Sequence, residues 1–133
     1  TRKLLIKNPV YSQQEHNRLF SALHYLARQF LEQGYRVVFD ATNLNARYRR
    51  PLQSIAEETG VVAATVYFNT PRETARKRMK QRRVGYSDAD WSVYKMLETE
   101  FEPLSGPYYE IKPGMDIGRI IDRIVSDIKQ KQK

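Results

Sequence analysis

The chain has 133 residues and a formal net charge of +8, and 41% of its residues are hydrophobic. This length and composition fit one globular domain and exclude an intrinsically disordered chain. The absence of cysteine from the sequence excludes disulfide bonds and thiolate metal sites. The sequence shows neither an apolar run long enough to span a bilayer nor a signal-peptide pattern, so we expect a cytoplasmic protein with no membrane partner.

The positive charge is concentrated in residues 72–83, where seven basic residues stand against the single acid Glu73. A second basic cluster, formed by Arg47, Arg49 and Arg50, lies upstream of it. Such clusters raise the local concentration of anionic partners such as nucleotides, phosphates or nucleic acid. A solvated helix face is the alternative interpretation of either cluster taken alone.

The first helix is predicted to begin after Ser12, which forms a capping box with Glu15, and to end at Gly34. Apolar residues recur between these ends at helical spacing: Leu19, Phe20, Leu23, Leu26, Ala27, Phe30 and Leu31. His16 and His24 fall on or beside the apolar side of this helix. Because neither has a second ligand at i+4, we expect core or boundary histidines rather than a metal site.

A short apolar run at residues 36–39 ends in Asp40 and is predicted to be a buried strand. Asp40, Thr42 and Asn43 would then lie beyond the carboxyl end of a parallel strand, where α/β proteins bind ligands. The alternative is ordinary turn chemistry, in which Asn45 caps the following helix.

That helix is predicted over residues 46–59, with Pro51 inside it and Gly60 at its end. The run at 61–68 is apolar almost throughout and predicts a second strand, buried on both faces as in a parallel sheet.

A helix start at Thr70 predicts the next helix over residues 70–83. Ala75 and Met79 mark its inner face, and Arg78 and Arg82 fall on or beside that face. An unpaired buried charge is costly, so two inward arginines require an anionic partner. No carboxylate in this segment supplies one.

Ser87 and Asp90 form a capping pair before a helix whose buried side is predicted to be core rather than a base-stacking platform. That side comprises Trp91, Tyr94, Leu97 and Phe101. A short strand at 108–111 and a final helix capped by Asp116 complete the chain. The alternation of helices and strands predicts a three-layer α/β/α domain with a mostly parallel sheet.

In this order and spacing, the residues resemble the polynucleotide-kinase-like branch of the P-loop kinases, AAA-type ATPases related to zeta toxins. The resemblance covers most of the chain. It rests on Gly34, Asp40-Ala41-Thr42-Asn43, Arg47 or Arg49, the pair Arg78 and Arg82, Ser87-Asp88-Ala89 and Phe101-Glu102-Pro103.

The resemblance implies an enzyme that moves the γ-phosphoryl group of ATP to a hydroxyl of a nucleotide, polynucleotide or small molecule, with Mg²⁺ bridging the phosphates. It implies that Arg78 and Arg82 act from a lid at about residues 70–90, where they neutralise charge on the transferring group.

For the remaining site residues, the resemblance implies that Asp40 holds a water on Mg²⁺ or orients the acceptor. Thr42 and Asn43 would shape the site, and Arg47 would bind substrate. Arg2 matches an arginine that contacts substrate phosphate in this family.

The chain departs from the family in one respect, because Gly-x-x-x-x-Gly-Lys-Ser/Thr occurs nowhere in its 133 residues. We therefore expect residues 1–133 to be the downstream part of a single P-loop kinase-like domain that lacks its N-terminal strand and phosphate loop. An upstream segment or a second chain would supply the loop, and the 133 residues alone would be inactive.

Three hypotheses stay open: a phosphotransferase, a basic non-catalytic nucleic-acid-binding domain, and a degenerate P-loop scaffold. Converging arginines would favour the first, and a continuous outward stripe of basic residues would favour the second.

Overall fold

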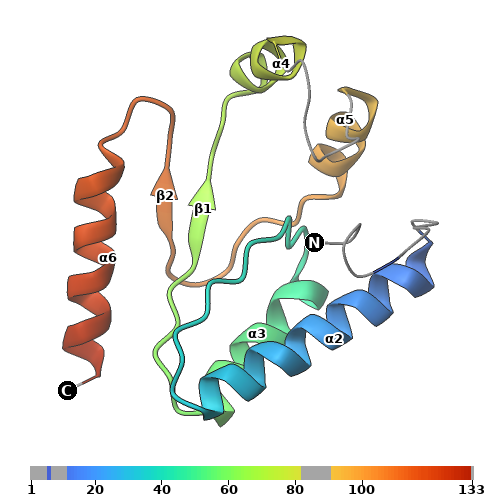
Figure 1. Ribbon diagram of the computed structural model, residues 1–133. Helices are drawn as coiled ribbons and strands as arrows, with labels where there is room; N and C mark the ends of the chain where they lie inside the picture. The colour runs from blue at the N-terminus through green and yellow to red at the C-terminus, as the bar shows by residue number, and fades with distance from the viewer. Residues whose placement is uncertain (1–5, 7–11, 82–90, 133) are drawn as a thin grey trace. The chain divides into compact units, whose positions relative to one another are not determined.

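The computed structural model of the chain describes residues 6, 12–81 and 91–132. Their elements divide between two compact units, Thr1–Thr42 with Arg50–Val61 and Asn43–Arg49 with Val62–Lys133. In chain order the elements are α2 (Gln13–Glu32), α3 (Ala46–Glu58), β1 (Val66–Phe68), α4 (Arg72–Gln81), α5 (Trp91–Glu100), β2 (Tyr109–Ile111) and α6 (Ile117–Lys131) (Figure 1). The described residues therefore form an α/β fold with a small parallel sheet, which is compatible with a P-loop NTPase-like fold.

In the first unit, α2 begins and ends where its sequence predicts. The hydroxyl of Ser12 accepts a hydrogen bond from the backbone N–H of Glu15 at 3.1 Å. Gly34 follows the helix with φ +82°, a conformation that glycine adopts without steric cost. Three members of the predicted apolar stripe are buried: Leu19, Phe20 and Ala27.

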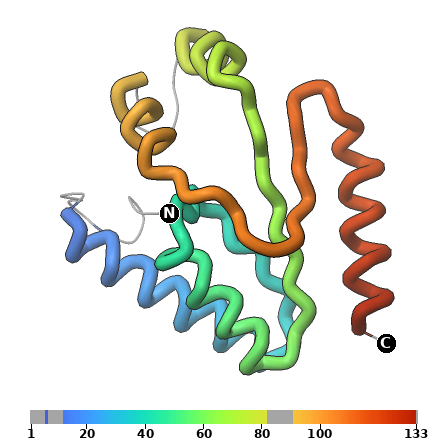
Figure 2. The backbone as a smooth tube through the Cα atoms, turned by 180° about the vertical axis from the view of Figure 1, so that it is seen from behind, coloured from blue at the N-terminus to red at the C-terminus, as the bar shows by residue number. Residues whose placement is uncertain are grey.

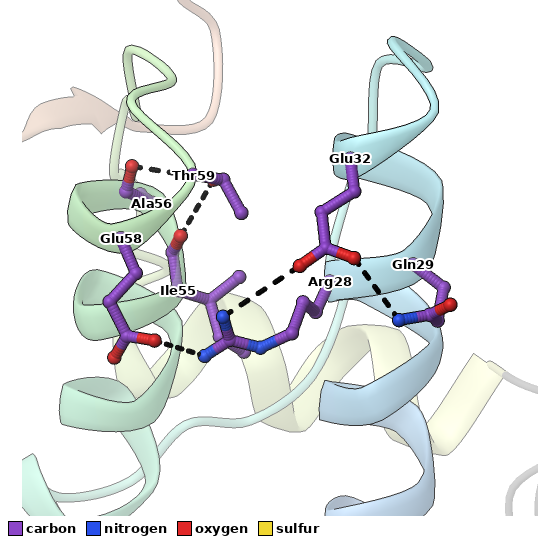
Figure 3. Close-up of polar contacts among 7 residues, drawn as sticks. All are labelled: Arg28, Gln29, Glu32, Ile55, Ala56, Glu58 and Thr59. Atoms are coloured by element: carbon purple, nitrogen blue, oxygen red, sulfur yellow. Dashed lines mark hydrogen bonds and ion pairs between the residues drawn. The ribbon is translucent and has the colours of Figure 1, made fainter.

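The part of α3 that belongs to this unit lies beside α2, and Arg28 connects the two helices (Figure 3). The guanidinium of Arg28 lies 3.9 Å from the Glu32 carboxylate on its own helix and also pairs with Glu58 of α3. Both pairs are partly exposed, so water weakens them and each contributes only tenths of a kcal/mol, about 0.2–1. Burial of Ile55 and Ala56 therefore accounts for more of the packing at this end of α3.

Residues 35–40 are extended, but the structure forms no strand there, so the predicted buried strand is wrong. Val38 is 93% exposed, whereas Phe39 lies against α2, with ring centroids 6.1 Å from Phe20 and 5.4 Å from His24. A strand requires a neighbouring backbone to pair with, and no described segment supplies one here. His16 and His24 are half-buried, as predicted, and burial lowers the pKa of His24.

In the second unit, β1 pairs in parallel with β2, with Val66 opposite Tyr109 and Phe68 opposite Ile111. The predicted strand at 61–68 is therefore only three residues long, and its expected burial on both faces is wrong. Val66 is 37% exposed and Phe68 67% exposed. The reason is that, among the described residues, β1 packs mainly against its partner strand, and the helix that packs on the sheet, α6, lies against β2.

Helix α6 runs alongside β2 (Figure 2) and begins at Asp116, whose carboxylate accepts from the N–H of Arg119 at 3.2 Å, as predicted. Three apolar residues of this helix stay exposed: Ile117, Ile121 and Val125 are 52%, 50% and 42% exposed. No helix in the described ranges is both long and apolar enough to cross a membrane.

Replacing Ser12 with alanine should lower the free energy of unfolding by about 1 kcal/mol, because the N–H of Glu15 loses its cap. Ser21→Ala is the matched control, since Ser21 is exposed inside α2, where alanine is the better helix former. Urea denaturation measures both variants. Equal stability of the two would show that the cap contributes nothing.

Candidate functional site

Five of the predicted site residues lie in the described part of the chain, and they are divided between the two units. Asp40 and Thr42 belong to the first unit, and both are exposed. Asn43, Arg47 and Arg78 belong to the second. Arg2 and Arg82 lie outside the described residues, and the convergence of Asp40 with Arg78 stays a prediction.

The loop that begins at Asn43 is tied to residues 101–103. Asn43 has φ +43°, which is unusual for a residue with a side chain. The backbone N–H of Glu102 donates to the carbonyl of Leu44 at 2.8 Å. In return, the Glu102 carboxylate accepts from the N–H of Ala46 at 2.9 Å. Two segments more than fifty residues apart are therefore joined at the first residue of α3.

Arg49 makes the remaining contacts of this tie. Its guanidinium donates to the carbonyls of Asn43, Leu44 and Pro103 at 3.3, 3.4 and 3.2 Å. It also lies 5.9 Å from the centre of the Phe101 ring, within the range of a cation–π contact. The guanidinium of Arg49 is therefore already bound to other groups of the protein.

Arg47 is placed differently from Arg49, although the resemblance allowed either residue. It is exposed on the first turn of α3 and makes no hydrogen bond or ion pair with the described residues. Its planar guanidinium is therefore available to an anion, because nothing in the described part of the chain neutralises it.

The cap of α3 differs from the predicted one. The side-chain oxygen of Asn45 is buried and has no hydrogen-bond partner among the described residues, so the expected capping by Asn45 is wrong. The Glu102 carboxylate supplies the acceptor instead, and its negative charge suits the positive end of the helix. In the sequence, Glu102 belongs to the motif Phe101-Glu102-Pro103 and has no predicted capping role, because capping over such a separation leaves no local signal.

Helix α4 places its basic side chains outward. Ala75 and Met79 are half-buried, as predicted, but Arg78 is exposed, so the expectation that it turns toward the body is wrong. The helix has no buried residue, so no enclosed face of α4 takes in the Arg78 side chain.

Helix α5 is held to α4 through Trp91. The guanidinium groups of Arg72 and Arg76 each lie 5.6 Å from the centre of this ring, and Tyr94 stacks on it at 4.7 Å. Arg72 also lies 3.7 Å from the Glu98 carboxylate. Trp91 and Tyr94 are half-buried, so the predicted inner side of α5 is only partly enclosed. Burial raises the pKa of Tyr94, and Glu98 adds to the shift.

Past the carboxyl end of β1, the Asn69 amide donates to the Glu110 carboxylate at 2.8 Å. Lys112 lies 3.1 Å from the same carboxylate. The hydrogen bond from Asn69, followed by the contact with Lys112, lowers the pKa of Glu110. Neither Asn69 nor Glu110 was predicted as part of a polar contact, because β pairing alone brings them together.

The parallel strand pair and the alternation of helices and strands along the chain are compatible with a P-loop NTPase-like fold. The chain belongs to the AAA domain family, whose model matches residues 3–104. This is a P-loop kinase-like family, so the broad resemblance found in the sequence is confirmed. No curated protein and no solved structure matches the chain.

Replacing Asn69 with alanine should raise the pKa of Glu110 toward its ordinary value, and more than Lys112→Ala does, because the Asn69 hydrogen bond is the larger cause. A lowered carboxyl pKa stabilises the fold above the unfolded-state pKa, and this contribution disappears as the pH falls through the folded-state pKa. The wild type should therefore lose more stability on acidification than Asn69→Ala. NMR titration of the Glu110 carboxyl carbon checks the order of the two shifts, and the reverse order would contradict the assignment.

Proposed function

We propose that the complete protein is an ATP-dependent phosphotransferase of the polynucleotide-kinase-like branch, which moves a γ-phosphoryl group to a hydroxyl of a nucleotide, polynucleotide or small molecule. The family match over residues 3–104 carries this proposal. It spans the motif from Asp40 to Asn43, Arg47 and both lid arginines in one continuous stretch.

The exposed arginines are available to bind phosphate, which a nucleic-acid-binding domain would also require. Arg47 offers an unoccupied guanidinium at the start of α3, and this group can bind two phosphate oxygens at once. The nearby N–H of Ala46 already donates to Glu102, so the side chain of Arg47 rather than this amide would bind substrate. Arg78, exposed on α4, would neutralise charge on the transferring group together with Arg82.

The donor groups of the described residues fit a magnesium site that relies on water and substrate. Magnesium commonly takes one or two carboxylates, with waters and phosphate oxygens completing its shell. The described residues contain no group of three or more His, Cys, Asp or Glu that could form an all-protein cage, whereas Asp40 is an exposed carboxylate. Asp40 would hold the ion through a water, with Thr42 and Asn43 shaping the site. When bound, Mg²⁺ supplies charge neutralisation across the ATP phosphates.

In this proposal a further strand pairs with the free edge of β1, and the phosphate loop follows that strand. Among the described residues this edge carries no hydrogen-bonded neighbour, and Phe68 on the strand is 67% exposed. An unpaired strand edge is a ready site for another strand. An upstream segment or a second chain would supply that strand and, after it, the glycine-rich loop.

In the protein that contains its phosphate loop, Asp40→Asn should lower kcat for phosphoryl transfer about 100-fold, because the ion or acceptor loses its anchor. Arg47→Ala should instead raise the KM of the substrate about tenfold, because it removes a binding contact. Transfer of labelled γ-phosphate to nucleosides, 5′-hydroxyl oligonucleotides and sugars measures both.

Arg18→Ala is the control for Arg47→Ala, since Arg18 is an exposed helical arginine that belongs to neither basic cluster. An unchanged kcat in Asp40→Asn, together with an unchanged substrate KM in Arg47→Ala, would contradict the assignment of these residues.

The isolated 133-residue chain should bind ATP with Mg²⁺ only weakly, with a Kd above about 1 mM, because it has no glycine-rich loop to surround the phosphates. Isothermal titration calorimetry measures this affinity. Submillimolar binding by the isolated chain would show that the phosphate cradle lies within these residues after all.

A further inference from the structure

We infer that Arg49 and Glu102 are positioning residues: they fix the loop at residues 43–46 against residues 101–103 and thereby place Asn43 and Arg47 for substrate. This inference rests on the proposed function and adds two residues to it. Neither would touch substrate, because the described contacts of both groups end on the protein itself.

Arg49 fixes the loop through three carbonyl groups at once. Two of them, those of Asn43 and Leu44, lie in the loop, and the third, that of Pro103, lies in the opposite segment. Only a planar, forked guanidinium can donate in several fixed directions, so lysine cannot replace it. The left-handed backbone of Asn43 is costly, and it persists where surrounding contacts enforce it.

Glu102 fixes the start of α3. Its carboxylate accepts a hydrogen bond from the N–H of Ala46, and its own N–H donates to the Leu44 carbonyl. One residue therefore makes two hydrogen bonds with the loop. Arg47 follows Ala46 directly and lies on the first turn, which means that its position depends on where the helix begins. Loss of this carboxylate would free the first turn to fray.

Phe101 connects this arrangement to the sheet. Its ring centre lies 5.9 Å from the Arg49 guanidinium and 5.5 Å from the ring of Tyr67 on β1, to which it is nearly parallel, at 16°. Through Phe101, the loop is thus connected to strand β1 as well as to the end of α5. A site residue that starts from a rigid element is held more closely than one on a free loop.

The test uses the complete protein with its phosphate loop and the variants Glu102→Ala and Arg49→Lys. Glu102→Ala should increase amide hydrogen exchange at Ala46 about tenfold and raise the substrate KM about tenfold with kcat little changed. Arg49→Lys keeps the charge and should raise KM to a similar extent. Combining Glu102→Ala with Arg47→Ala should raise KM no further than Arg47→Ala alone, because the carboxylate acts through Arg47.

Glu100→Ala and Arg18→Lys are the matched controls, since both residues are exposed helical residues with no assigned role. Additive effects of Glu102→Ala and Arg47→Ala on KM would overturn the inference. So would a lower Tm with KM unchanged, which would make the contacts merely structural. If the wild type transfers phosphate to no acceptor, the proposed function fails, whereas unchanged exchange at Ala46 in Glu102→Ala refutes the positioning contact itself.

Discussion

The second unit depends on a reciprocal pair of hydrogen bonds between Glu102 and the start of α3. One residue donates to Leu44 and accepts from Ala46, which joins segments 56 residues apart. Closing so long a loop costs conformational entropy, and this cost must be offset by what the closure brings together. Here it brings together Arg49, Phe101 and Tyr67, which add cation–π and stacking contacts to the hydrogen bonds.

Contacts between segments that are far apart in sequence also decide where this chain forms a sheet. β1 and β2 pair because α4 and α5 lie between them in sequence and allow a parallel crossover. Residues 35–40 have a comparable apolar composition and form no strand pairing within the part of the chain that the structure describes. Strand formation therefore follows the availability of a neighbouring backbone more closely than it follows local composition.

This dependence explains which features the sequence could predict. Helix ends are local, so Ser12, Gly34 and Asp116 mark boundaries that the structure confirms. Strand lengths and side-chain directions are not local. The burial expected of Phe68 and the inward direction expected of Arg78 both failed because they required packing partners that the described residues do not supply. The family could be predicted from motif order, whereas the role of Glu102 needed coordinates.

The sparse burial of side chains has a thermodynamic consequence. Among the described residues, the buried hydrophobic set comprises Leu19, Phe20, Ala27, Ile55, Ala56 and Ile111, and even Ala27 keeps 5% of its surface accessible. Unfolding would therefore expose less new apolar surface than the unfolding of a fully packed domain of the same length. The heat-capacity increment per residue should be small, the stability curve shallow in temperature, and the transition in urea broad rather than abrupt.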